Sequence, residues 1–391
     1  MKFNLKERFY RLVRCEGASG WSQRRILAKL GFRRQPILKV ADGFATADAL
    51  FDGGKPSAAT RWLIYPESVE TAELPKTVEP EDAGGFAQHL VRTHAPAYVY
   101  RIPEAFYLGK HGAVLDKDRR VFSDLLDAKA EYFQPEMNKN RAFLCDGDAL
   151  VLTASANHFH WLVKMLPRLH LLERAGLSLD AFETLLINRP LKAHQEAYPL
   201  LPQLSNKPMQ VVRRNDFWIC RNLYTCSIPH NVPRWATEGI RELFARHLVA
   251  QDGKPKAIYL TRGDSGKRCV RNEAEVRACL EKRGFVTVDF SQCSFLEQIQ
   301  WMASAEVIVA PHGAALANLV FAREGTRLLE IFAHSENQKC YWMIARHNRL
   351  VYHYCMAEPV PTGSDGNAFD MRIPVPKLER ALDALLADPG V

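Results

Sequence analysis

The sequence has no long apolar run: no stretch approaches 18 uninterrupted apolar residues, which excludes a membrane-spanning helix. Its nine cysteines include no CxxC pair, so they predict neither a zinc site nor a disulfide framework and fit reduced thiols in a cytosol. The N-terminus lacks the apolar core that a secretory signal carries. No GxGxxG and no GxSxG occurs, which argues against a nicotinamide dehydrogenase and an α/β-hydrolase.

The composition is that of an ordinary globular protein. Apolar residues make up 47% and charged residues 25% of the chain, which excludes disorder, collagen and coiled coil for the whole molecule. A length of 391 residues is too great for one ordinary core and suits two domains.

The net charge of +8 is concentrated at the N-terminus. Residues 1–40 carry eleven Lys/Arg and two acids, which leaves the other residues at −1. The body of the protein therefore lacks the basic surface that nucleic acid requires, and no nucleic-acid partner is predicted. Leu5, Phe9 and Leu12 recur at helical spacing among the basic residues, a pattern of amphipathic helices that lie on anionic membranes. A first helix docked on its own domain is the commoner use of this pattern.

The remaining chain divides into a β-rich part and two α/β parts. Residues 41–60 are turn-rich, 61–122 contain short β-like runs, and 123–147 show no clear period. From 150 onward, strands alternate with helices, which predicts parallel sheets. We expect an N-terminal segment (1–40), an N-terminal domain (41–235, with an α/β part at 150–235), a C-terminal domain (236–356), and a tail with a helix (357–391). Two such α/β domains would bind a ligand in the cleft between them, at the carboxyl ends of the strands.

One candidate site follows the strand at 307–310. The chain there runs into Pro311-His312-Gly313-Ala314-Ala315 before a helix. Small residues let main-chain N–H groups approach an anion, and the positive end of the helix dipole favours a phosphate or diphosphate. His312 would add a side-chain donor. A tight turn whose small residues serve packing alone explains the pattern equally well.

A second candidate is a basic loop after the strand at 258–262. Arg262, Lys267 and Arg268 follow the carboxyl end of that strand, where cations could clamp a diphosphate. The loop lacks the GxxxxGK[ST] spacing of a P-loop. Taken alone, it is more typical of a solvated surface loop.

The third candidate is a polar stripe on the helix that begins at Asn157. Asn157, His160, Lys164 and Arg168 follow at helical spacing on a helix that should pack against a sheet. Burying a polar group without a hydrogen-bond partner costs free energy, so polar residues on this helix face need an explanation. His160 could act as a general base near neutral pH. Alternatively, His160 is a structural histidine whose hydrogen bonds are satisfied inside the protein, which is the commoner case for a lone histidine.

Two acidic tripeptides could in principle hold a divalent metal. They are Asp116-Lys117-Asp118 and Asp146-Gly147-Asp148, and both lie in turn-like contexts. We interpret them as turns and predict no metal site.

Together, three segments resemble glycosyltransferase family 61 in order and spacing over about residues 150–355. They are Asn157-x-x-His160-Trp161 with Pro167-Arg168-Leu169; Tyr259-Leu260-Thr261-Arg262 with Arg268-x-x-x-Asn272-Glu273; and Pro311-His312-Gly313-Ala314-Ala315-x-x-Asn318-x-x-Phe321 with Glu330-Ile331. The first 120 residues carry no such resemblance.

The resemblance implies an inverting, metal-independent hexosyl- or pentosyltransferase with a GT-B fold, in which two Rossmann-like domains face a cleft. Its donor would be a nucleotide sugar, in this family mostly UDP-linked. Its acceptor would be a capsule, exopolysaccharide or lipopolysaccharide glycan, free or lipid-linked, on the cytoplasmic side of a bacterial inner membrane. Residues 1–40 would then make the peripheral membrane contact. No cofactor is expected.

The resemblance also assigns roles by position. Arg262, Arg268 and the turn His312–Ala314 would hold the diphosphate, and Glu330 would face the ribose hydroxyls. Asn318 and Glu273 would orient these groups or cap their helices.

Lys164 departs from the family pattern, because relatives carry an acid at this position. Either His160 is the base, or the base comes from elsewhere, or Lys164 binds an acidic donor or acceptor. A nucleotide-sugar-binding regulator or scaffold without turnover is the alternative function, and a polyanion-binding module that uses residues 1–40 is a third.

Overall fold

The computed structural model describes residues 43–51, 58–79, 84–109, 112–126, 141–154, 157–213, 216–263, 268–332, 339–361 and 369–390. The basic segment 1–40 and Lys267 lie outside these ranges. The predicted membrane helix and the predicted role of Lys267 are therefore not addressed by the structure.

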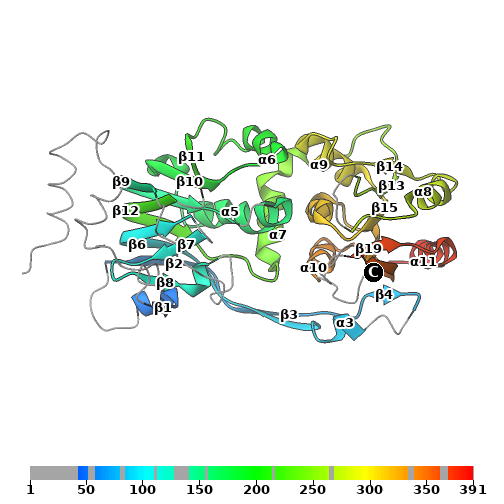
Figure 1. Ribbon diagram of the computed structural model, residues 1–391, viewed down its shortest axis with the longest axis horizontal. Coiled ribbons are helices and arrows are strands. Elements are labelled where there is room, and N and C mark those ends of the chain that lie inside the picture. The colour runs from blue at the N-terminus through cyan, green and yellow to red at the C-terminus, as the bar shows by residue number, and fades with distance from the viewer. Residues whose placement is uncertain are drawn as a thin grey trace, which may run out of the picture.

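The described chain forms two lobes, each built on one large sheet (Figure 1). The sheet of the N-terminal lobe has the strand order β1-β8-β7-β6-β12-β9-β10-β11, with β2 also paired to β6. Strands β12, β9, β10 and β11 run parallel, whereas β6 is antiparallel to β12 and β7 to β6. The strands are β1 (Gly43–Ala45), β2 (Thr60–Tyr65), β6 (Ala97–Leu108), β7 (Ala113–Leu115), β8 (Arg120–Phe122), β9 (Arg141–Leu152), β10 (Thr184–Asn188), β11 (Met209–Val212) and β12 (Asp216–Cys226).

The sheet of the C-terminal lobe is parallel throughout, in the order β14-β13-β15-β16-β17-β4. Its strands are β4 (Lys76–Thr77), β13 (Ala257–Leu260), β14 (Val286–Val288), β15 (Val307–Pro311), β16 (Arg327–Phe332) and β17 (Val351–Met356). A separate hairpin pairs β18 (Glu358–Pro361) with β19 (Phe369–Arg372). The prediction of an α/β protein with parallel sheets is confirmed.

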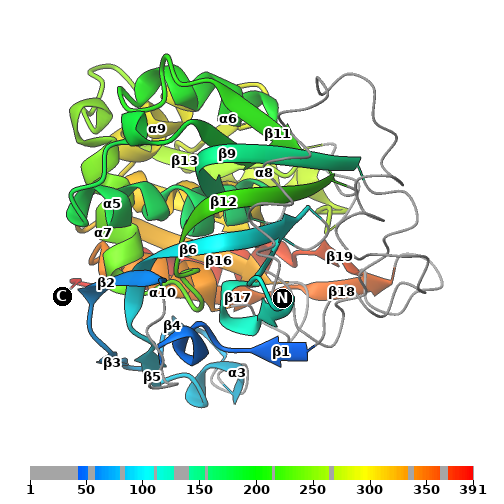
Figure 2. The same cartoon turned by 90° about the vertical axis from the view of Figure 1, so that its left-hand side faces the viewer.

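Helices connect the strands and lie between and outside the two sheets (Figures 1 and 2). The α-helices are α3 (Gly84–Ala87), α4 (His158–His160), α5 (Pro167–Arg174), α6 (Lys192–Ala197), α7 (Arg234–Leu243), α8 (Glu273–Glu281), α9 (Phe295–Ser304), α10 (Cys340–His347) and α11 (Val375–Ala387). A π-helical turn, η7 (Trp161–Met165), joins α4 to α5. The short 3-10 helices are η2 (Ala47–Leu50), η5 (Ser123–Leu125), η8 (Leu179–Ala181), η9 (Tyr198–Leu200), η10 (Ala245–His247) and η11 (Ala314–Phe321).

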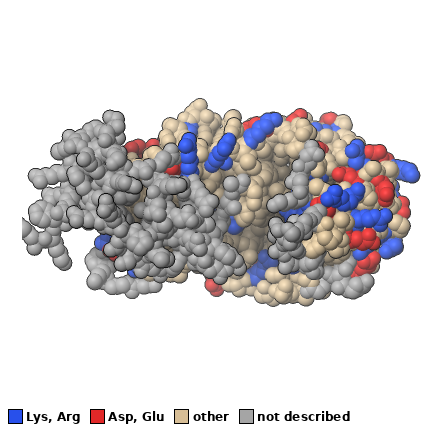
Figure 3. Space-filling model, viewed as in Figure 1, with Lys and Arg blue, Asp and Glu red and all other residues tan. Residues whose placement is uncertain are grey.

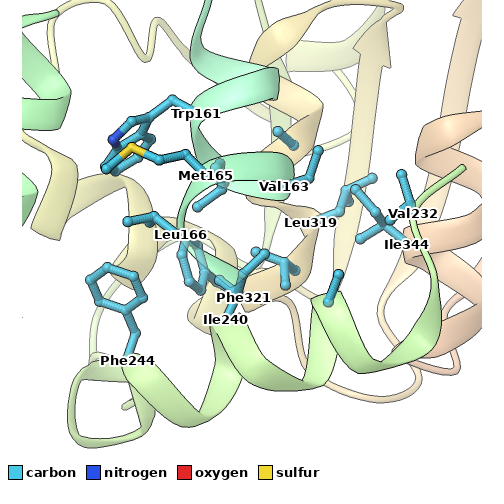
Figure 4. Packing of buried hydrophobic residues seen from close by; sticks show 14 of the residues in the cluster. Trp161, Val163, Met165, Leu166, Val232, Ile240, Phe244, Leu319, Phe321 and Ile344 are labelled. Atoms are coloured by element: carbon cyan, nitrogen blue, oxygen red, sulfur yellow. The ribbon is translucent and has the colours of Figure 1, made fainter. Parts of the chain in front are cut away.

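One hydrophobic core joins the two lobes. It includes Trp161 and Leu166 from the N-terminal lobe, Ile240 of α7, and Leu319 and Phe321 of η11 (Figure 4). These side chains are at most 4% exposed. Burial of apolar surface on this scale is the main force that holds two layers together, so the lobes pack against each other through their facing helices.

A segment from the N-terminal lobe crosses to the other lobe. We call it the strap (residues 66–79 and 84–96). Its strands β3 (Ser68–Thr71) and β5 (Val91–His94) pair as a ribbon that leads to β4 and α3 along one side of the molecule (Figure 1). Phe86 of α3 is fully buried in the C-terminal lobe, 4.7 Å from the ring of Tyr354 and 5.2 Å from that of Trp342.

Several local predictions needed correction. The predicted loop 41–60 contains β1 and η2, and the region 123–147 contains η5 and the first residues of β9. The β-rich part is continuous with the α/β part, because β6 pairs along its length with β12.

Candidate active site

The turn after β15 has the predicted form. Strand β15 ends at Pro311, and Gly313 occupies the N-cap position of η11, whose first residue is Ala314. The main-chain N–H of His312 donates to the Ile331 carbonyl at 2.8 Å, which ties the turn to the neighbouring strand β16. The turn therefore lies at the carboxyl ends of two adjacent parallel strands, where open sheets bind ligands.

The side chain of His312 is fixed by a buried carboxylate. Its Nδ1 lies 2.5 Å from Oε1 of Glu330, and the Tyr352 hydroxyl donates to Oε2 of Glu330 at 2.7 Å. Glu330 is 0% exposed. The imidazole also stacks on the Phe332 ring at 5.1 Å. Because a carboxylate on Nδ1 fixes the ring's orientation, Glu330 positions His312. Both oxygens of Glu330 are bonded inside the protein, so this placement does not match the expected direct contact with ribose.

Arg262 packs against the same turn. Its Nη1 donates to the His312 carbonyl at 2.8 Å. A Cβ atom added to Gly313 would lie 1.8 Å from that Nη1 atom, a distance that real atoms do not reach. The backbone φ of Gly313 is −177°, so the residue's lack of a side chain, not its backbone freedom, is what the site requires.

Positive charge gathers beside this turn. Burial lowers the pKa of Arg262, and the nearby charge of Arg268 lowers it further. Arg268 has a left-handed backbone with φ of 58°, a conformation that costs free energy in a residue other than glycine. Thr261 is held by Glu273, whose Oε1 accepts from the hydroxyls of Thr261 at 2.5 Å and Tyr259 at 3.1 Å. Glu273 thus orients the strand end that carries Arg262.

The predicted residues of the N-terminal lobe lie where β9 leads into α4. The side chain of Asn157 caps the helix by accepting the His160 N–H at 2.9 Å. His160 and Lys164 are half-buried, and Lys164 lies within the π-helical turn. Such turns widen the helix by one residue and are frequent at functional sites.

Arg168 does not continue the predicted polar stripe to the surface. Its guanidinium donates to the carbonyls of Val151 at 2.8 Å and Thr153 at 2.9 Å and to the Thr225 hydroxyl at 2.7 Å. Arg168 is 2% exposed. It therefore donates to main-chain carbonyls at the end of β9, inside the lobe, and is not placed to contact a ligand.

Aromatic rings connect the two groups of residues. The Phe159 ring packs edge-on against Tyr341 at 5.6 Å and against its neighbour His160 at 5.4 Å. The Tyr341 ring in turn lies 4.9 Å from His312. The structure thus brings the Asn157–Lys164 segment and the cluster of Arg262, His312, Gly313 and Glu330 to one region between the lobes.

Asn318 serves a different part of the interface. It is fully buried; its Nδ2 donates to Gln298 and to the Ala315 carbonyl, and its Oδ1 lies 3.4 Å from Nε2 of His158. These bonds join η11 to α9 and to the helix of the other lobe. Asn318 therefore links η11 to the helices packed against it.

Sequence reasoning missed Tyr341, Tyr352 and Phe332. Phe332 comes from β16, the strand next to the turn, Tyr352 from the following strand β17, and Tyr341 from the first turn of α10. Tyr341 follows the carboxyl end of β16 in the sequence, and this position could have marked it as a candidate site residue. The two tyrosine hydroxyls add neutral donors, because burial raises the pKa of both well above the ordinary value.

Among the described residues, no group of three or more His, Cys, Asp or Glu side chains could hold a metal ion, and no helix is both long and apolar enough to span a bilayer. On the face seen in Figure 3, Lys, Arg, Asp and Glu are interspersed over the C-terminal lobe, and the band between the lobes carries few charges.

The family comparison coincides with this geometry. The family model described as Glycosyltransferase 61 matches residues 158–329, from α4 to β16. The matched segment is a glycosyltransferase family 61 domain. This glycosyltransferase 61 match spans both lobes and includes His160, Arg262 and His312, while Asn157 and Glu330 lie one residue outside it. The protein is accordingly a glycosyltransferase, an enzyme that acts on a sugar donor and an acceptor. No curated protein matches the chain.

Proposed function

We propose that this enzyme transfers a sugar from a UDP-linked donor to a hydroxyl of a bacterial surface glycan, with inversion and without a metal. The supporting observation is the guanidinium of Arg262 held against the glycine turn at the carboxyl ends of β15 and β16. A half-buried cation beside main-chain N–H groups suits the diphosphate of a nucleotide sugar. In this proposal the two lobes act as the two Rossmann-like domains of a GT-B fold.

The proposed reaction is a single displacement. The acceptor oxygen gives its proton to the imidazole of His160 and forms a bond to the anomeric carbon. The bond from that carbon to the diphosphate oxygen breaks, and its electron pair stays on the nucleoside diphosphate. Arg262, Arg268 and the N–H groups that follow Gly313 stabilise the charge that develops there. Asn157 holds the His160 main chain, and Lys164 binds an acidic group of donor or acceptor.

The first experiment is a thermal-shift panel of UDP, GDP, CMP and their sugars, with EDTA present. A ligand that binds only the native state at a hundred times its Kd stabilises it by about 2.7 kcal/mol. We expect uridine nucleotides to raise Tm and Arg262→Ala to abolish the shift. Arg277→Ala, on the exposed surface of α8, is the matched control and should keep it. The absence of a shift with every nucleotide would overturn the donor assignment.

The base is tested separately. His160→Ala should retain the UDP shift but lose both sugar transfer and slow hydrolysis of the donor. Transfer that survives this substitution would remove His160 from the proposed role and place the base elsewhere.

We also propose that residues 1–40, with their balance of +9, hold the enzyme at the inner face of the inner membrane. Deletion of residues 1–20 should move the protein from the membrane to the soluble fraction. Unchanged fractionation would refute this contact.

A further inference from the structure

A small notch opens beside the proposed catalytic helix, at the carboxyl ends of β9 and β10. Its lining includes Asn188, Arg189, His194, Tyr198 and the indole of Trp161. The closed part measures about 10 Å³, which is room for one water-sized atom.

His194 presents a hydrogen-bond donor to this notch. The Leu191 N–H donates to its Nδ1 at 3.2 Å, so in the neutral ring the hydrogen lies on Nε2. Burial, and then the charge of His158, lower the pKa of His194 to about 3, so the ring is neutral at physiological pH. The side chain is 2% exposed, and its Nε2 has no hydrogen-bond partner in the described part of the chain. A buried donor without an acceptor is costly unless something fills the notch.

The other polar groups at the notch are donors as well. Oδ1 of Asn188 accepts the Ala154 N–H at 2.5 Å, which leaves the amide NH2 group for a ligand. Burial raises the pKa of Tyr198 to about 12, so its hydroxyl keeps its hydrogen. Arg189 is exposed and supplies a guanidinium. No Asp or Glu is among the residues that line the notch.

The notch also contacts the helical segment that carries the proposed base. The His194 ring stacks on Trp161 at 4.1 Å with an interplanar angle of 9°. Trp161 follows His160 directly and begins the π-helical turn. A group bound in the notch would therefore lie on the acceptor side of the proposed base.

We propose that the notch is an acceptor subsite for an anionic oxygen group, a carboxylate or a phosphate carried on the acceptor sugar. One oxygen enters the closed part and accepts from Nε2 of His194, and the rest of the group lies toward Arg189. The inference rests on the proposed function for its assignment to the acceptor, but the binding of the anion does not depend on it.

The test uses the full-length Arg262→Ala protein, so that the diphosphate cluster cannot bind the probe. Tm is measured with glucuronate, with glucose 6-phosphate and with glucose, all at equal ionic strength. We expect one or both anions to raise Tm and glucose to leave it unchanged. A response to glucuronate alone assigns a carboxylate, and a response to the phosphate alone assigns a phosphate.

Two further variants test the residues. His194→Phe keeps the stack on Trp161 but removes the N–H donor, and Arg189→Gln removes the exposed charge. Each variant should either lose the Tm shift with the anion or bind the anion with an apparent Kd at least fivefold higher. Arg277→Gln is the matched control. Equal shifts with glucose and the anions, or an unchanged anion response in both variants, would overturn the proposal and leave a water-filled notch. Retention of the UDP shift in His194→Phe with wild-type Arg262 separates this result from failure of the donor assignment.

Discussion

The imidazole of His312 and the carboxylate of Glu330 form one buried unit, with Nδ1 and Oε1 2.5 Å apart. The second oxygen of Glu330 accepts from Tyr352, so the carboxylate has no remaining freedom to turn. A turn of small residues would otherwise leave the histidine ring several orientations. The acid at the end of β16 thus determines which nitrogen of His312 faces the region between the lobes.

The first prediction concerns this unit. Glu330→Gln keeps the volume but removes the anion that orients His312. We expect a weaker UDP shift, equivalent to about a tenfold rise in Kd, the effect of losing about 1.4 kcal/mol. Titration of UDP by calorimetry measures it. Tyr352→Phe should have a smaller effect, and an unchanged Kd in Glu330→Gln would show that the orientation of His312 does not matter for binding.

The second prediction uses the close approach of Gly313 to Arg262. Gly313→Ala should displace the guanidinium and abolish the UDP shift as completely as Arg262→Ala does, because the new Cβ would lie 1.8 Å from Nη1. A double-mutant cycle provides the control. The alanine at 313 should cost little more once Arg262 is already Ala, since contacting residues are not additive. Additive losses would mean that Gly313 acts through another group.

The third prediction concerns acid stability at the strap. Burial raises the pKa of Glu70, but the hydrogen bond from His347 and the charges of His347 and His94 outweigh it and lower the pKa to about 2. A folded pKa below the unfolded value of 4.5 means that the contribution is fully present above pH 4.5 and is lost as pH falls toward 2. We expect Tm of the wild type to exceed that of Glu70→Gln at pH 7.

The gap between the two proteins should narrow on acidification below pH 4.5. Thermal unfolding from pH 7 to pH 3 measures both curves. A constant gap across this range would show that the ionised carboxylate of Glu70 contributes nothing to stability.

The fourth prediction concerns Phe86, the side chain of the strap that fills the C-terminal lobe. Phe86→Ala should lower the free energy of unfolding by about 3–5 kcal/mol, the range for large-to-small changes in cores. Phe86 also packs at 6.3 Å against Phe332, which stacks on His312, so UDP binding should weaken too. Phe86→Leu refills most of the space and is the control in urea unfolding. If Phe86→Ala lowers the free energy of unfolding as predicted but leaves the Kd for UDP unchanged, the strap does not influence the site.

The sequence predicted those parts of the fold and site that depend on local pattern. Residues such as Arg262, His312 and Gly313 follow buried strands, and parallel strands of one sheet end on the same side, so their proximity could be expected. The same reasoning located His160 at the start of its helix. Local pattern also predicted the alternation of strands and helices from residue 150 onward.

What the sequence could not show depends on contacts between distant segments. Nothing in the local pattern around residue 76 indicates that β4 pairs with β17, nearly 280 positions away. The burial of Glu330 depends on a tyrosine from the next strand, and that of Asn318 on a helix of the other lobe. Periodicity identifies a buried position but not the partner that satisfies it.

The strap also determines how the protein can be divided. Strand β4 covers the outer edge of β17, and Asp388 near the C-terminus accepts from Lys76 and lies 2.7 Å from His353. A fragment cut near residue 236 would leave that edge with unpaired main-chain groups, a template for aggregation. The C-terminal half is therefore not an exchangeable module: it could be transplanted to another scaffold only together with the strap of the half that precedes it.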